Sequence, residues 1–186
     1  MQKNVIRIIG GIYKRTKLDI LDICGLRPTP DRLRETLFNW LGDLNDVKCL
    51  DLFAGSGALG FECLSRGAKD VTFVEKDRQI FEKLNLMKDK LKLDEKANFF
   101  NQDSIKYLTS INSQIFNSKF DLIFIDPPYS SNLLEKSLEL SINILSKDGK
   151  IYIESNKNLE QIIKDNNLSI LKHIKMGQIF AYLIKV

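Results

Sequence analysis

The sequence holds one histidine and three cysteines among its 186 residues, and this scarcity limits the chemistry available to it. Cys24, Cys49 and Cys63 form no Cys-x-x-Cys pair, so neither a disulfide framework nor a zinc site is expected. A Ser-His pair or a multi-histidine metal site would have to use His173, which lies in an expected C-terminal strand. An enzyme of this composition must therefore rely on carboxylates, aromatic rings and backbone groups, and no metal is expected.

Long apolar runs are also absent. No run approaches the length of a membrane span, and the N-terminal "MQKNVIRIIGG" has no apolar signal-peptide core. The apolar fraction of 44% is nevertheless large enough to fill a substantial core, and the length suits one domain of ordinary size. We expect a soluble, cytoplasmic protein that is not associated with a membrane.

Acidic residues are scarce at the beginning of the chain. Residues 1–34 hold eight Lys and Arg against three Asp, whereas residues 35–186 hold twenty basic residues against twenty-one acidic ones. The net charge of +4 therefore comes from the N-terminal segment. Such an excess is typical of a segment that contacts a polyanion, although a solvated surface with chance clustering would give the same pattern.

After residue 47, short apolar segments alternate with amphipathic ones. Strands are expected near 48–53, 71–75, 97–102, 120–126, 149–155, 168–175 and 179–185, and helices near 57–66, 77–92, 104–110, 132–145 and 158–165. This alternation predicts an α/β fold with a mostly parallel sheet covered on both faces. The last two strands are joined by the tight "MGQ" turn, so they should form an antiparallel hairpin.

The segment before the sheet is expected to be a small extension of the main domain. A hairpin over 5–18 would turn at Gly10-Gly11, and a helix over 31–42 would place Leu33, Leu37 and Phe38 on one side. We therefore divide the chain into a basic N-terminal extension, residues 1–45, and a main domain, residues 46–186.

The first strand is followed by a glycine-rich turn, "DLFAGSGALGFECL". Gly55, Gly57 and Gly60 match G-x-G-x-x-G, a pattern that lets the backbone approach a ligand at a helix N-terminus. Glu75 ends the next strand twenty residues after Gly55, where an acid can accept from a ribose hydroxyl pair. The combination indicates a cofactor that contains a nucleoside.

The acid before the glycines favours a cationic cofactor over a dinucleotide. Asp51 ends the first strand, and its carboxylate would repel the pyrophosphate of NAD. S-adenosylmethionine carries an ammonium and a sulfonium, which suit a nearby carboxylate. The chain also lacks the second domain and the proton-transfer residue that a dehydrogenase would need.

Two further expected strands end in acids, Asp103 after "ANFFNQ" and Asp126 after "FDLIFI". Ligands of open α/β sheets lie outside the carboxyl ends of the strands. Asp103 could accept from an adenine amino group or cap the helix that starts at Ser104, and the two roles are compatible. Asp126 alone would suggest only a strand end before a turn, but its strand is expected to lie beside the first strand and so beside the cofactor.

The motif Asp126-Pro127-Pro128-Tyr129 suits methyl transfer to an exocyclic amino group. The nitrogen lone pair of such a group is delocalised into the ring, and fixed acceptors for its two N–H bonds favour the pyramidal nitrogen that can react. The Asp126 carboxylate and the Pro127 carbonyl oxygen are the expected acceptors. Tyr129 would stack on the extruded base, a contact worth about 1–3 kcal/mol.

Several segments together carry a resemblance to a known family: "IRIIGG", "GLRPTPDRLRETLFNWL", "DLFAGSGALGFECLSRGA", "FVEKD" and "DPPY". They resemble the bacterial RsmD family, which methylates N2 of a guanine in 16S (small-subunit) ribosomal RNA. The resemblance covers nearly the whole chain, and its N-terminal segment is the most discriminating part. It implies a Rossmann-like class I methyltransferase with a seven-stranded sheet, and catalysis at residues 126–129.

The resemblance also implies the cofactor contacts, and the basic N-terminal segment suggests the contacts with the partner. The expected S-adenosylmethionine contacts are Asp51, Phe53, Gly55, Gly57, Glu75, Asp103 and Ser104. Thr29 and Asp31 would help to close over the cofactor. The residues expected to grip RNA phosphates beside the catalytic motif are Arg7, Lys14, Arg15, Lys17, Arg27 and Arg32. The alternative for this segment is that its apolar residues pack the helix on the sheet while Arg27 and Arg34 form surface ion pairs.

Three alternative functions remain open at the level of the sequence. A DNA adenine-N6 methyltransferase would use the same chemistry, but about 45 residues before the sheet leave little room for a target-reading domain. A protein glutamine methyltransferase uses a related Pro-Pro-Tyr motif but would not need the basic excess. The chain could also be an inactive RNA-binding module, although the intact acid, proline pair and aromatic argue against that.

Overall fold

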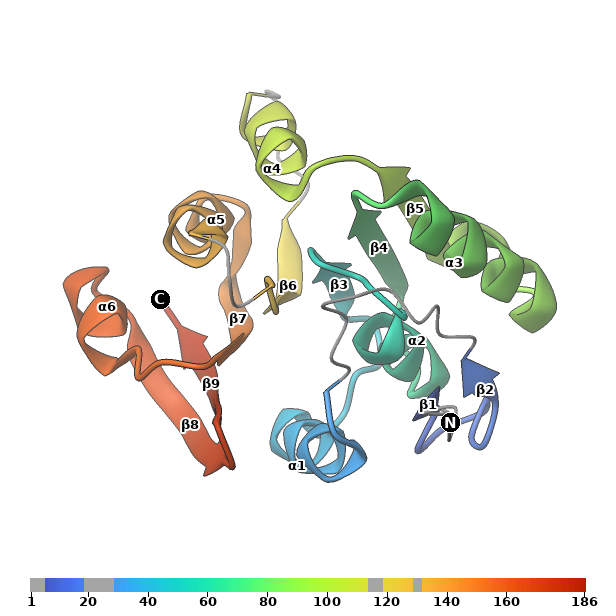
Figure 1. Ribbon diagram of the computed structural model, residues 1–186, viewed down its shortest axis with the longest axis horizontal. Coiled ribbons are helices and arrows are strands. Elements are labelled where there is room, and N and C mark those ends of the chain that lie inside the picture. Colours follow the sequence, from blue (N-terminus) through green and yellow to red (C-terminus); the bar gives the residue numbers. More distant parts are fainter. Residues whose placement is uncertain (1–5, 19–28, 114–118, 129–131) are drawn as a thin grey trace.

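The computed structural model describes residues 6–18, 29–113, 119–128 and 132–186 (Figure 1). Its main sheet consists of β3 (Lys48–Asp51), β4 (Asp70–Glu75), β5 (Ala97–Asn101), β6 (Phe120–Ile125), β7 (Leu145–Ser155), β8 (Ser169–Met176) and β9 (Ile179–Lys185). The spatial order is β5-β4-β3-β6-β7-β9-β8. The strands from β5 to β7 run parallel, and β9 is antiparallel to both of its neighbours. The predicted sheet and its antiparallel C-terminal hairpin are confirmed.

Helices cover both faces of the sheet because its central strands are apolar on both sides. The helices are α1 (Asp31–Leu41), α2 (Ala58–Ser65), α3 (Arg78–Leu91), α4 (Ser104–Asn112), α5 (Leu133–Ile142) and α6 (Glu160–Asp165), with a 3-10 turn η1 (Asp94–Lys96). One core cluster holds the apolar side chains of α1, α2 and α3, and the other holds those of α4, α5 and α6. Figure 1 shows these two groups of helices on opposite sides of the sheet.

One boundary differs from the sequence prediction by more than the others. Strand β7 begins at Leu145 instead of 149, and α5 ends at Ile142 instead of continuing to 145. Leu145 pairs with Phe120 before a register shift, and the Phe120 amide donates to the Ile144 carbonyl. Pairing with the neighbouring strand therefore extends a segment whose polar sequence gave no strand signal. Among the described residues, no helix is long and apolar enough to cross a membrane.

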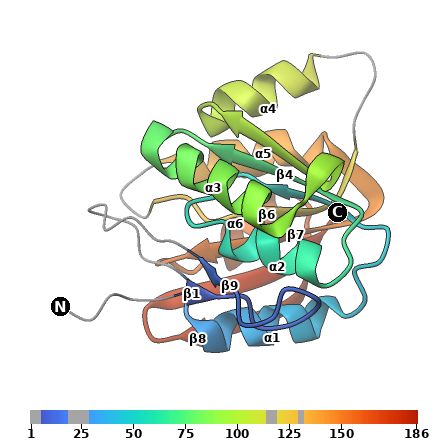
Figure 2. The ribbon, with the colours of Figure 1, turned by 90° about the vertical axis from the view of Figure 1, so that its right-hand side faces the viewer.

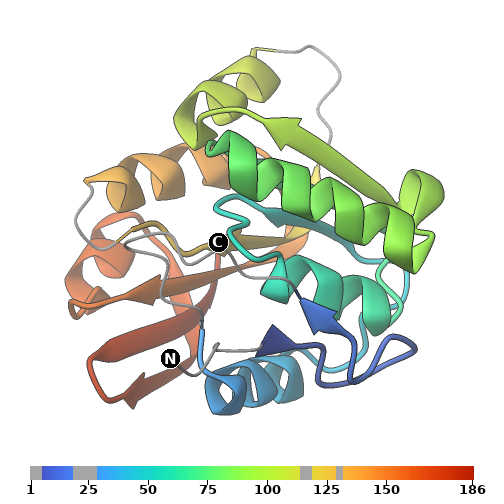
Figure 3. The ribbon, with the colours of Figure 1, turned by 45° about the vertical axis from the view of Figure 1, so that its right-hand side comes forward.

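The N-terminal hairpin packs on the end of helix α2. Strands β1 (Ile6–Arg7) and β2 (Lys17–Leu18) pair antiparallel, and Figure 2 and Figure 3 show them beside α1 and α2. Gly11 has a φ of 71°, and a Cβ there would lie 1.7 Å from the Ser65 carbonyl oxygen. The Ile12 amide donates to that same oxygen at 2.8 Å. The turn predicted at Gly10-Gly11 thus needs glycine because the chain touches the helix backbone.

The carboxylate of Glu62, in α2, holds this hairpin in place from inside the protein. It is fully buried and accepts from the Ile9 amide at 2.7 Å and from the Gly10 amide at 2.8 Å. It also accepts from Arg66 Nε at 2.7 Å, and Arg34 Nη1 lies 3.9 Å away. Four donors therefore surround one buried anion, which satisfies the requirement for burying it.

Arg34 of α1 is also fully buried, so the sequence-based alternative of a surface ion pair is wrong. Its Nη2 donates to the Arg7 carbonyl at 2.9 Å and to Asp31 at 2.6 Å. The Leu33, Leu37 and Phe38 side chains pack the same helix into the core, as predicted. The buried charges of α1 and α2 thus join the N-terminal segment to the sheet.

Glu62→Ala should reduce the free energy of unfolding by roughly 3–5 kcal/mol, because it removes the buried counter-ion of Arg34 and leaves the Ile9 and Gly10 amides without their acceptor. Urea unfolding would measure this loss. Glu82→Ala is the matched control, since Glu82 is 61% exposed and forms a surface ion pair with Arg78 on α3; its effect should stay within about 1 kcal/mol. Equal effects of the two substitutions would contradict the anchoring role of Glu62.

Candidate active site

Four acids stand at the carboxyl ends of four consecutive strands. In the spatial order β4-β3-β6-β7 they are Glu75, Asp51, Asp126 and Glu154. The residues two positions before them, Phe73, Cys49, Phe124 and Tyr152, all belong to the core cluster beneath α1 and α2. Because side chains alternate along a strand, the four acids point toward that same face. The fold therefore gathers carboxylates that are scattered along the sequence.

The glycine-rich turn lies directly over Asp51. The Gly60 amide, in α2, donates to Asp51 Oδ2 at 3.0 Å, and the Gly57 amide donates to the Ala54 carbonyl at 2.7 Å. Gly57 has a φ of 73°, and a Cβ on Gly60 would lie 2.2 Å from the Phe73 ring. The motif is thus explained by a left-handed turn and by close packing of helix on strand.

Glu75 and Asp103, the two acids predicted to bind the nucleoside, both accept hydrogen bonds from backbone amides. Glu75 Oε2 accepts from the Gly55 amide at 2.9 Å, so the acid lies against the glycine turn from the neighbouring strand. Its Oε1 accepts from the Asp77 amide at 2.8 Å. Asp103 Oδ1 accepts from the amides of Ile105 and Lys106, which confirms that it caps α4. Its Oδ2 lies 3.7 Å from Lys76 Nζ.

Two other expected cofactor contacts lie close to this turn. Phe53 is half-buried at the start of the turn and packs against the core cluster beneath α4 and α5. The Ser104 hydroxyl is buried and donates to the Leu52 carbonyl at 2.8 Å, which ties α4 to the end of β3. The side chain of Ser104 thus has a protein partner in this structure.

Asp126 follows β6, beside Asp51 and Glu154. It is half-buried, and Pro127 after it is buried. Glu154 Oε1 accepts from Thr29 Oγ1 at 2.8 Å and from the Tyr152 hydroxyl at 2.9 Å. Thr29, two residues before α1, therefore reaches the edge of the sheet where these acids lie.

Burial at this edge raises the pKa values of all four acids. Burial raises the pKa of Asp51 to about 7, against the Gly60 hydrogen bond, which lowers it. Burial likewise raises the pKa of Glu154 to about 7 and raises that of Glu75. The pKa of Asp126 is raised by burial first and then by the nearby charges of Glu154 and Asp51. A cation placed at this edge would be attracted by all four groups.

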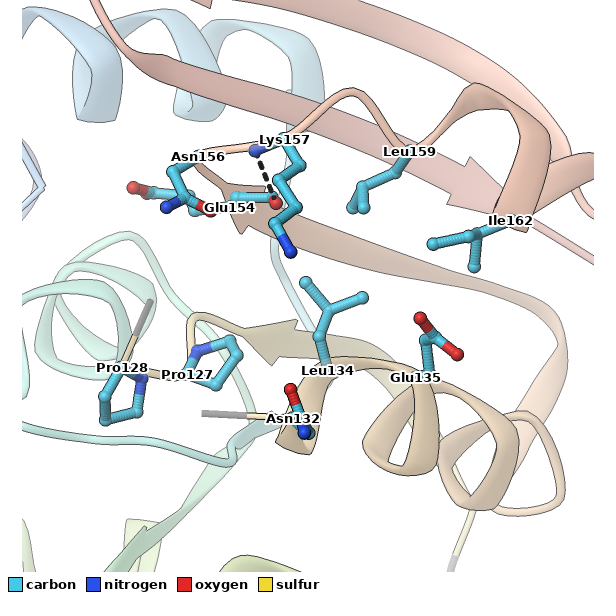
Figure 4. Close-up of a pocket in the computed structure, with 11 residues that line it drawn as sticks. Pro127, Pro128, Asn132, Leu134, Glu135, Glu154, Asn156, Lys157, Leu159 and Ile162 are labelled. Atoms are coloured by element: carbon cyan, nitrogen blue, oxygen red, sulfur yellow. Dashed lines mark hydrogen bonds between the residues drawn. The ribbon is translucent and has the colours of Figure 1, made fainter. Parts of the chain in front are cut away.

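A cavity of about 400 Å³ opens beside Pro127 and Pro128 (Figure 4). The opposite wall comes from the end of β7 with Glu154, the following segment with Lys157, and α6 with Ile162, and α5 contributes Leu134. Figure 4 shows these side chains around one space, with the Lys157 amide donating to Ser155 Oγ at 3.0 Å. The volume is within the range of small-molecule sites.

The expected RNA-contacting residues are spread over the N-terminal segment. Arg7, Lys14, Arg15, Lys17 and Arg32 are all exposed. The turn that carries Lys14 and Arg15 lies at the C-terminal end of α2, where the Tyr13 amide donates to Ser65 Oγ, and helix α2 separates this turn from the glycine turn. Arg7 is nearer to α1, because Arg34 donates to its carbonyl. The group therefore forms an extended surface instead of a cluster around Asp126.

Two expected site residues, Tyr129 and Arg27, lie outside the described residues. The sequence analysis also missed Glu154, which the structure places in the site. Its signal was present, since Glu154 follows the apolar "IYI" just as Asp126 follows "IFI". Arg34 and Glu62 left no such signal, because their burial depends on how α1 and α2 meet.

Known proteins similar to this chain agree with the fold and the site. A family model described as "Conserved hypothetical protein 95" matches residues 6–185. The ribosomal RNA small subunit methyltransferase D of Haemophilus influenzae is 42% identical over 179 residues, covering 94% of this chain and 91% of that protein. Its Escherichia coli namesake is 42% identical over 153 residues, covering 81% and 74%.

A solved structure named as the putative methyltransferase yhhF from Escherichia coli aligns with a TM-score of 0.85 and 38% identity. The alignment covers 97% of each chain. The acids and glycines discussed above therefore sit on a methyltransferase-like scaffold whose arrangement is shared over nearly the whole chain.

Unfolding of the ligand-free protein should depend on pH through Asp51. Its pKa is raised to about 7 by folding, so the folded state binds more protons, and stability is lost as pH rises toward 7. The loss should approach about 1.4 kcal/mol per pH unit between the unfolded and folded pKa values. Urea unfolding from pH 5 to pH 8 should show a flatter dependence for Asp51→Asn. The control Asp89→Asn changes an exposed residue of α3, and its stability should vary with pH as that of the wild type does. The same pH dependence in all three proteins would contradict the role of Asp51.

Proposed function

The chain belongs to the family described as "Conserved hypothetical protein 95", and we propose that it methylates the N2 amino group of a guanine in 16S ribosomal RNA. The methyl donor is S-adenosylmethionine. The observation that carries this proposal is the match to the ribosomal RNA small subunit methyltransferase D proteins across nearly the whole chain. The acid, proline pair and glycine turn that the chemistry requires lie together at one sheet edge.

The residues present suit S-adenosylmethionine, which supplies a methyl group on a positively charged sulfur. Four carboxyl groups with raised pKa values face this edge, and a cationic ligand would favour their charged forms. The glycine turn would present its backbone to the ligand, and Glu75, which contacts that turn, and Asp103 would accept from the ribose and the adenine amino group. A structure named as SMU.776, a putative methyltransferase complexed with SAH, shares the fold with a TM-score of 0.68 at 20% identity, covering 83% of this chain and 48% of that one.

Asp126 and the Pro127 carbonyl would accept from the two N–H bonds of the target amino group. Pro127 is buried, so its carbonyl is held still, and the proline ring fixes the backbone torsion. These acceptors matter most as the nitrogen becomes pyramidal, so they stabilise the transition state more than the ground state. Tyr129 would stack on the base, and the cavity of about 400 Å³ beside Pro127 and Pro128 offers room for that base.

The substrate must present an unpaired guanine, because an amino group inside a duplex cannot reach Asp126. The exposed basic residues of the N-terminal segment would hold the surrounding phosphates. The name of the relatives specifies small-subunit ribosomal RNA, which the enzyme would meet either as free RNA or within the small ribosomal subunit, and such an enzyme would act in the cytoplasm. A DNA adenine methyltransferase would instead methylate DNA, and a protein glutamine methyltransferase would methylate protein. An inactive RNA-binding module could bind the cofactor but would transfer no methyl group.

Asp126→Ala should slow methyl transfer at least about 100-fold in a single turnover while S-adenosylmethionine affinity changes little, because the lost contact forms mainly in the transition state. Asp126→Asn should be milder, since an amide oxygen still accepts. The assay uses labelled S-adenosylmethionine with 16S RNA and, separately, with small subunits that lack the modification. Labelled DNA or protein in parallel incubations, or a full-rate Asp126→Ala enzyme, would contradict the proposal.

Replacing Arg7, Lys14 and Arg15 together with Gln should weaken RNA binding and flatten its salt dependence. Each lost phosphate contact removes roughly 0.7–0.9 from the slope of log K against log salt. The control replaces Lys90, Lys92 and Lys96 with Gln in the same way; these lysines are exposed near the end of α3 and at η1. The slope of log K against log salt for this control should match that of the wild type. If both triple variants lower the slope equally, the N-terminal segment has no special role.

A further inference from the structure

Glu154 lies beside Asp126 in the structure, although the two residues are far apart in the sequence. Ile125 pairs with Ile153 in the parallel register of β6 and β7, so the next two positions are Asp126 and Glu154. Neighbouring strands are about 4.8 Å apart, and both side chains point to the face covered by α1. Glu154 also lines the cavity next to Pro127 (Figure 4). It is only 1% exposed, which is rare for a glutamate unless it has a defined role.

Thr29 joins the two acids from the N-terminal segment. Its Oγ1 donates to Glu154 Oε1 at 2.8 Å, and a hydrogen bond from the same side chain lowers the pKa of Asp126. Thr29 is buried, although it lies between Asp31 on the surface and a stretch of chain outside the described residues. A surface loop that only connected two elements would not need a buried hydroxyl that hydrogen-bonds to two acids.

Other charged and titratable groups also face this pair. On the sheet, Asp51 of β3 and the Tyr152 hydroxyl of β7 are adjacent. From the covering helix, Arg34 of α1 lowers the pKa of Glu154 by its charge. The cavity lining adds Lys157, on the same wall as Glu154, and the exposed Glu135 of α5. Glu154 is the nearest acid, and its charge raises the pKa of Asp126 more than that of Asp51 does.

We propose that Glu154 and Thr29 are positioning residues that set the orientation and charge of the Asp126 carboxylate, which receives the proton released by the methylated nitrogen. This inference rests on the proposed function. In the reaction the new N–C bond forms as the C–S bond breaks, and the C–S electron pair stays on sulfur. The nitrogen then gives up one proton, which Asp126 takes and later passes to solvent.

The two positioning residues change the basicity of Asp126 in opposite directions. The negative charge of Glu154 makes Asp126 a stronger base, because a second anion nearby opposes ionisation. The Thr29 hydroxyl makes both acids weaker bases, because its hydrogen bond favours their charged forms. A residue with only a packing role would change the stability of the protein or its affinity for S-adenosylmethionine. It would not move the acidic limb of the pH–rate profile.

The test is the pH dependence of single-turnover methylation of small ribosomal subunits that lack the modification, with saturating enzyme and S-adenosylmethionine. Glu154→Gln should move the acidic limb of the profile to lower pH by at least about half a unit, and Thr29→Val should move it to higher pH. Thr29→Ser, which keeps the hydroxyl, should restore the wild-type limb. Glu139→Gln removes an exposed acid of α5 and should leave the limb unmoved.

Calorimetry with S-adenosylmethionine and circular dichroism show whether each variant is folded, and Thr29→Val keeps the proposal testable if Glu154→Gln does not fold. Acidic limbs that stay at the wild-type pH, or that move in the same direction for Glu154→Gln and Thr29→Val, would overturn the positioning role. A wild-type enzyme that methylates no ribosomal RNA would instead refute the proposed function. The two failures are therefore distinguishable.

Discussion

The arrangement of the whole N-terminal half depends on the buried carboxylate of Glu62. It satisfies the amides of Ile9 and Gly10 and lies 3.9 Å from Arg34, so hairpin, α1 and α2 meet at one anion. Burying this charge is tolerable only because several donors surround it. The consequence reaches the active edge of the sheet, since the position of α1 brings Thr29 onto Glu154.

The carboxylates at the edge of the sheet, unlike Glu62, are not surrounded by hydrogen-bond donors among the described residues. Asp51 and Glu154 are buried with few donors, and their raised pKa values show that the folded protein holds them at a cost in stability. A cationic cofactor would relieve that cost, so the energy stored in the ligand-free site becomes affinity for the methyl donor. Stability in the N-terminal half and reactivity at the sheet edge therefore come from acids in two different environments.

The elements and the cofactor motif could be predicted from the sequence to within a few residues, because both depend on local patterns. Apolar runs of strand length gave β3, β4 and β6, and the spacing of the glycines placed the turn beside Glu75. The start of β7 at Leu145 was missed, because pairing with Phe120 is a long-range contact that leaves no periodic signal. The burial of Arg34 was missed for the same reason.

The sequence by itself determined the fold class, the glycine turn and the acids that end the strands, since hydrophobic period and turn chemistry act between near neighbours. It also determined the excess of basic residues before the sheet. The sequence also predicted that the strands of Asp51 and Asp126 are neighbours, but only the tertiary structure decided that Glu154 shares their face and that Thr29 reaches both Asp126 and Glu154. The physical reason is that strand order and helix docking are set by packing of residues far apart in the chain, and the pKa values of the acids follow from that packing.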